Sequence, residues 1–112
     1  MKEDILIKTA KEYYASALEE HKKARYNSSV VLFFKALIAL TDLYILQKTK
    51  SSPSSHTNRF QITKKYFPEV YDLLDKDFPY YQDSYIQIMS KDLAEAIKDD
   101  VQIMAKKTET RL

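Results

Sequence analysis

The stretch from Ser28 to Lys48 is the most apolar part of this 112-residue chain, and it limits the possible folds more than any other feature. Its apolar residues cover most of the circumference of a helix with 3.6 residues per turn. They are Val30, Val31, Phe33, Phe34, Leu37, Ile38, Leu40, Leu43, Tyr44, Ile45 and Leu46. A helix that is apolar on nearly all sides has to be surrounded. The stretch therefore predicts a central helix packed by the other segments, with any uncovered part meeting another chain.

The composition favours an all-α domain. Glycine is absent and proline occurs three times, so the chain lacks the residues that hairpin turns and glycine-rich loops require. The absence of cysteine excludes disulfides, a thiolate nucleophile and a cysteine metal site. We expect residues 1–112 to form one helical domain without a cofactor.

The distribution of charge favours a cytoplasmic protein. The first residues, MKEDILIKTAKEYY, are charged throughout and lack the apolar core of a signal peptide. The central stretch approaches the length of a membrane span, but Lys35 and Asp42 would each cost about 2.5–3.5 kcal/mol at the centre of a bilayer. We therefore expect no membrane association.

The first half of the chain predicts two long antiparallel helices. The first spans about Glu3 to Arg25 and carries an apolar stripe on one side. Tyr26–Ser28 forms a short polar break, in which Asn27 or Ser28 is the expected N-cap of the central helix. So short a link places the two helices side by side in opposite directions.

The second half predicts a bent element and a closing helix. A Ser-rich loop over about residues 49–56 leads into a helix over Thr57–Tyr66, and Pro68 starts a second short helix that ends near Lys76. Residues 77–84 are expected to be irregular because Pro79 disfavours helical geometry before it. A last helix, capped by Asp83, Ser84 or Ser90, should run to about Lys106 and complete an up-and-down bundle.

Charged residues form a basic connector followed by an acidic segment. The net charge is only +2, but residues 43–68 contain no Asp or Glu, whereas residues 69–83 contain five acidic residues and one Lys. Solubility and mutual pairing explain this pattern most simply. Were the chain to bind an anion, we expect the residues facing it to be Lys48, Arg59, Lys64 and Lys65.

Two groups of residues are candidates for a ligand site. His56, Asn58, Arg59 and Lys64 lie near the predicted start of a helix and would suit a phosphate, although a polar cluster that caps this helix is the simpler explanation. Lys35 and Asp42 are seven residues apart, hence on nearly the same side of the central helix. That side is expected to be a solvated strip or, alternatively, a polar pocket completed by the segment Asp83–Tyr85. His21 and His56 share no metal-ligand spacing with carboxylates, so no metal site is expected.

The order of segments resembles that of the HEPN domain, a small α-helical bundle of prokaryotes found alone or beside minimal nucleotidyltransferases. The resemblance rests on VLFFKALIALTDLYILQKT, SHTNRFQITKKYFPEVYDLL and YYQDSYIQIMSKDLAEAIKDDVQIM, and it covers about Asp4 to Lys106. HEPN ribonucleases carry an Arg, then four to six residues and a His near the start of the last helix, and pair these residues across a dimer. The corresponding stretch here, YYQDSYIQIMSKDLAE, holds neither residue.

The resemblance thus implies a non-catalytic homodimer that binds a nucleotide, RNA or a protein partner such as a nucleotidyltransferase. The dimer contact is expected on the central and last helices. The alternative is a metal-independent ribonuclease or toxin of a toxin–antitoxin pair, whose non-standard site would use His56 or Tyr85 as the acid–base group.

Overall fold

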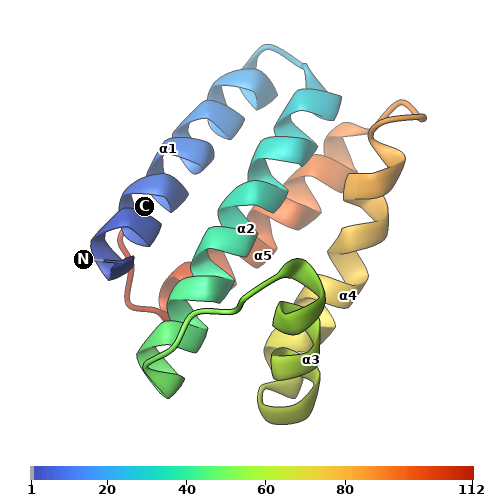
Figure 1. The fold of residues 1–112 in the computed structure, drawn as a ribbon. Helices are drawn as coiled ribbons and strands as arrows, with labels where there is room; N and C mark the ends of the chain where they lie inside the picture. The colour runs from blue at the N-terminus through green and yellow to red at the C-terminus, as the bar shows by residue number, and fades with distance from the viewer. Residues whose placement is uncertain (1) are drawn as a thin grey trace.

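The computed structural model describes residues 2–112, which form five α-helices and no strand (Figure 1). The helices are α1 (Lys2–Lys22), α2 (Tyr26–Thr49), α3 (His56–Tyr66), α4 (Pro68–Asp83) and α5 (Lys91–Lys107). The predicted all-α bundle is confirmed. Met1, the first residue of the predicted domain, lies outside the described residues.

The central helix is α2, as the apolar stretch predicts. α1 runs antiparallel along one side of it, α5 lies behind it and α4 lies on the other side, with α3 packed mainly on α4 (Figure 1). The side of α2 between α1 and α3 stays partly open. The fully buried α2 side chains include Val30, Phe33, Leu37, Leu40, Leu43 and Ile45. By length and composition alone α2 is also able to cross a membrane, but in this compact globule it is a core helix, with 61% of its apolar window buried.

The predicted N-cap of α2 is wrong. The cap position is occupied by Arg25, which makes no side-chain hydrogen bond to the helix. The Asn27 amide instead holds the loop between α4 and α5: its Nδ2 donates to the carbonyls of Ser84 (2.9 Å) and Gln87 (2.7 Å), and its Oδ1 accepts from the Met89 amide at 2.9 Å. The first turn of α2 therefore fixes a segment about 60 residues away in sequence.

The break before Pro68 and the cap of the last helix agree with the sequence. α3 ends at Tyr66, Phe67 joins it to α4, and Pro68 takes the first position of α4, where a missing N–H costs nothing. The Ser55 hydroxyl accepts from the Asn58 amide at 3.0 Å, and the Ser90 hydroxyl caps α5 by accepting from the Leu93 amide at 3.1 Å.

The prediction that residues 77–84 are irregular is wrong, because α4 continues through Pro79 to Asp83. Because proline has no backbone N–H, Pro79 cannot donate the helical hydrogen bond to the carbonyl of Asp75, four residues earlier. Both Asp75 and Pro79 are exposed, so water can satisfy that carbonyl. Packing of the opposite face of α4, which carries the buried Val70 and Leu74, offsets the remaining cost. The irregular segment is residues 84–90.

A carboxyl pair interrupts the apolar packing between α4 and α5. Asp77 is fully buried, neither of its oxygens has a hydrogen-bond donor, and the neighbouring Asp100 is only 4% exposed. Lys76 Nζ lies 2.8 Å from Asp100 Oδ2. Burial, followed by the interaction with Asp100, raises the pKa of Asp77 to about 8. Two carboxylates cannot donate to each other, whereas a protonated Asp77 can donate to Asp100.

Candidate functional site

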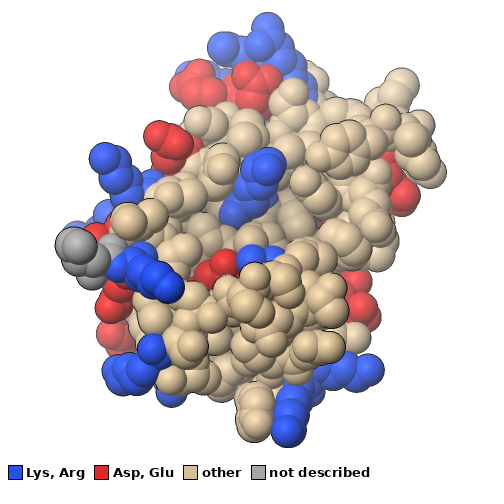
Figure 2. All heavy atoms as spheres, in the orientation of Figure 1, with Lys and Arg blue, Asp and Glu red and all other residues tan. Residues whose placement is uncertain are grey.

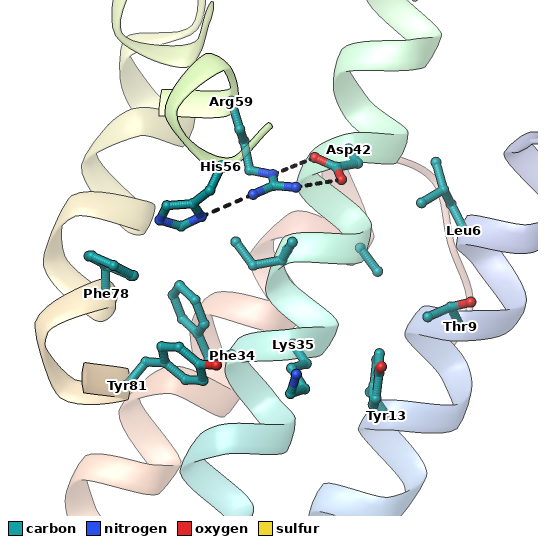
Figure 3. A pocket seen from close by; sticks show the side chains of 12 residues that line it. Leu6, Thr9, Tyr13, Phe34, Lys35, Asp42, His56, Arg59, Phe78 and Tyr81 are labelled. Atoms are coloured by element: carbon teal, nitrogen blue, oxygen red, sulfur yellow. Dashed lines mark hydrogen bonds and ion pairs between the residues drawn. The ribbon is translucent and has the colours of Figure 1, made fainter. Parts of the chain in front are cut away.

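A hollow of about 550 Å³ lies where α1 and the α3–α4 pair both meet α2 (Figure 3). Figure 2 shows it near the middle of a mostly uncharged face, with acidic and basic atoms together on its floor. This first hollow is lined by Leu6, Thr9, Tyr13, Phe34, Lys35, Ile38, Ala39, Asp42, His56, Arg59, Phe78 and Tyr81.

One wall of the first hollow is aromatic. The rings of Phe34 and Tyr81 are stacked, with centroids 4.7 Å apart and planes at 21°, and Phe78 lies 6.0 Å from Phe34. Phe34 is almost completely buried, so Tyr81 offers the accessible ring of this stack. The Tyr81 hydroxyl lies 3.1 Å from that of Tyr85, and this hydrogen bond, aided by burial, raises the pKa of Tyr81. The wall therefore stays uncharged near neutral pH.

On the floor, Arg59 of α3 is locked to Asp42 of α2. Arg59 Nε donates to Asp42 Oδ1 at 2.6 Å, and Nη2 donates to Oδ2 at 2.9 Å (Figure 3). The two side chains are only 13% and 17% exposed. A planar fork of this kind holds both partners in fixed positions and cancels their charges. The pair joins α3 to α2 and contributes no net charge to the hollow.

Arg59 also fixes the protonation of His56. Its Nη1 lies 3.1 Å from His56 Nδ1, and because a guanidinium only donates, Nδ1 has to be the acceptor. The ring proton therefore sits on Nε2, which remains available as a donor. Partial burial, then the positive charge of Arg59, lower the pKa of His56, while Asp42 opposes this effect. The imidazole is thus held neutral, against the rings of Phe60 and Phe78 (4.9 and 4.7 Å between centroids).

Lys35 supplies the net charge of the hollow. It is exposed on α2, between the Tyr81 side and the Tyr13 side, and its Nζ lies 5.9 Å from the centre of the Tyr13 ring (Figure 3). No carboxylate among residues 2–112 pairs with it within 4.0 Å. With Arg59 and Asp42 neutralising each other and His56 uncharged, one positive charge remains for a ligand.

Half of the residues predicted from the sequence meet here. Lys35, Asp42, His56 and Arg59 line one hollow. Lys35 is exposed, as expected for a solvated strip, whereas Asp42 is only 17% exposed and paired with Arg59. The expected completion by residues 83–85 is wrong, because Tyr81 closes the hollow and neither Asp83 nor Tyr85 lines it.

The other two predicted residues lie elsewhere. Asn58 belongs to the helix cap, since its Oδ1 accepts from the Ser54 amide at 3.0 Å while its own amide donates to Ser55. The capping alternative is therefore correct for Asn58. Lys64 lies further along α3, beside a neighbouring hollow.

Sequence reasoning missed the aromatic wall. Leu74, Phe78 and Tyr81 follow the four- and three-residue spacing of one helix face, a signal that identifies them as neighbours. Because a helix break is expected at Pro79, this spacing is not recognised. Leu6 and Tyr13 lie on the apolar stripe expected for the first helix, but their place in the hollow depends on how α1 lies against α2.

The hollow has the chemistry to hold a flat ring beside an anionic group. Tyr81 presents an aromatic face and Lys35 a cation, while the free Nε2–H of His56 lies on the side of its ring away from Lys35 (Figure 3). No three His, Cys, Asp or Glu side chains gather into a metal-binding group within residues 2–112. The chain matches no protein-family model and no curated protein.

Proposed function

We propose that this chain is a non-catalytic, HEPN-like helical module that binds a nucleotide, free or as part of RNA, in the first hollow. The observation that carries the proposal is an unpaired Lys35 beside the Phe34–Tyr81 stack, on a floor whose other charges cancel. A base would stack on Tyr81, while its phosphate would meet Lys35 Nζ.

A non-catalytic role follows from the groups around His56. Cleavage of RNA without a metal requires an acid–base group and a cation that stabilises the developing charge on phosphorus. Arg59, the cation next to His56, is held by both oxygens of Asp42 and has little capacity left for a phosphate. The ribonuclease alternative remains testable, since cleavage of single-stranded RNA in EDTA that disappears in His56→Ala would overturn the non-catalytic assignment.

Calorimetric titration with AMP tests the binding proposal. Lys35→Gln should weaken AMP binding about tenfold, because hydrogen bonds to charged groups contribute roughly 1.5–3 kcal/mol. Lys11→Gln, on the exposed side of α1, changes the net charge equally and should bind like wild type. Equal losses in both variants, or no AMP binding by the wild type, would overturn the proposal.

The loop between α4 and α5 supports a second candidate function, a protein-binding module. Tyr85, Ile86 and Ile88 are 70%, 80% and 95% exposed, yet the Asn27 amide holds their backbone in place. Rigid, adjacent apolar side chains of this kind are typical of contact surfaces. The occupant would be a second copy of the chain or a nucleotidyltransferase, in the cytoplasm.

Light scattering on the wild type and the double variant Ile86→Ser/Ile88→Ser tests the homodimer. A dimer that becomes a monomer in the variant supports it. A wild-type monomer, or a dimer that persists in the variant, excludes this surface as the self-contact.

A further inference from the structure

A second hollow, of about 390 Å³, adjoins the first hollow along the groove between α3 and α4. It is lined by His56, Thr57, Phe60, Gln61, Lys64, Tyr71 and Phe78. His56 and Phe78 line both hollows, so this pair of rings is a shared wall with one hollow on each side.

The second hollow repeats the chemistry of the first. Lys64 Nζ lies 5.8 Å from the centre of the Tyr71 ring, much as Lys35 Nζ lies 5.9 Å from that of Tyr13. Lys64 is exposed and, within residues 2–112, has no carboxylate within ion-pair distance. Each hollow thus combines aromatic side chains with one positive charge that the protein does not neutralise.

The shared wall carries a donor of its own. The His56 and Phe78 rings lie 4.7 Å apart, and Arg59 occupies His56 Nδ1, which leaves Nε2–H as the free polar group of the wall. A ligand that crosses from one hollow to the other passes this group. An anionic linkage at that point would gain a hydrogen bond, whereas an apolar linkage would not.

We infer that the two hollows are neighbouring subsites for a linear dinucleotide unit, with one nucleotide in each hollow and the linking phosphate beside His56. This inference rests on the proposed function, since it extends the same site. Proteins that bind single strands commonly stack successive bases on aromatic side chains and place cations along the backbone. The pairing of one aromatic group and one lysine per hollow fits that pattern, and a mononucleotide would use only half of it.

Calorimetry with two probes tests the inference: AMP and the 5′-phosphorylated dinucleotide pApA, in ribose and deoxyribose forms. We expect pApA to bind at least about fivefold more tightly than AMP, because a second stacked base adds roughly 1–3 kcal/mol. Lys64→Gln should remove most of this advantage and leave AMP binding in the first hollow unchanged. Lys65→Gln is the matched control, because Lys65 is also exposed on α3 but lies outside both hollows.

The outcomes separate this inference from the proposed function. If AMP binds and pApA binds no better, the second subsite is excluded while the nucleotide site stands. If pApA binds better but Lys64→Gln behaves like Lys65→Gln, the gain arises elsewhere and the inference is overturned. If neither probe binds, both proposals fail.

Discussion

Replacing Asp77 by Asn should stabilise the protein at neutral and mildly alkaline pH. Asp77 is a fully buried carboxyl group beside Asp100, and its pKa is about 8 instead of 3.8. The charged groups acting on it are Asp100 of α5, which raises its pKa, and Lys76 of α4, which lowers it. Since Asn is isosteric and can donate to Asp100, Asp77→Asn removes the titration and keeps the packing.

The sign and size follow from linkage. A raised carboxyl pKa means that the folded protein holds a proton that the unfolded chain has released between about pH 4 and pH 8, so stability falls as pH rises through that window. At pH 7 the pH is about three units above the ordinary pKa of 3.8. At about 1.36 kcal/mol per pH unit, keeping Asp77 protonated lowers the free energy of unfolding by on the order of 4 kcal/mol. Asp77→Asn should recover about 2–3 kcal/mol of this, or about 10 °C in Tm for a chain of this length.

Thermal unfolding followed by circular dichroism at pH 5, 7 and 8.5 measures the effect. The Tm advantage of Asp77→Asn should grow with pH, and its own Tm should vary less than that of the wild type. Asp75→Asn, on the exposed side of the same helix, removes an equal charge and is the control. An advantage that stays constant with pH, or a variant less stable than wild type at pH 8.5, would refute the reasoning.

Two further predictions concern Arg59 and Asn27, whose polar side chains connect separate segments of the fold. Arg59→Gln should raise the pKa of His56 toward its usual value, because the substitution removes a neighbouring positive charge while Asp42 remains. An NMR titration of the His56 ring measures this pKa. An unchanged pKa would show that burial alone lowers it. Asn27→Ala should speed hydrogen exchange of the Met89 amide and destabilise the protein by about 1–3 kcal/mol, because three hydrogen bonds to the loop are lost and two of them are part-buried. Exchange as slow as in the wild type would contradict the role given to Asn27.

The sequence predicts the helices well because their signals are local. The apolar stretch identifies α2, Pro68 marks the start of α4, and Ser90 is one of the expected caps of the last helix. The break expected at Pro79 is wrong because the free-energy cost of a proline inside a helix depends on whether the carbonyl that loses its hydrogen bond reaches water. That depends on which side of α4 faces the core. Asn27 misleads for a similar reason, since a residue typical of caps binds a distant loop instead.

The candidate site is harder to predict because it forms between segments far apart in sequence. The partnership of Asp42 with Arg59 spans the whole α2–α3 connection, and nothing in the spacing of these residues shows that they meet. The charges of α2 nevertheless contain the necessary signal. In a helix that is otherwise surrounded, a charged side chain needs either water or a partner: Lys35 is exposed, and Asp42 is paired with Arg59. Both residues line the first hollow, so charged positions within the apolar run of α2 indicate where the other helices leave room for a ligand.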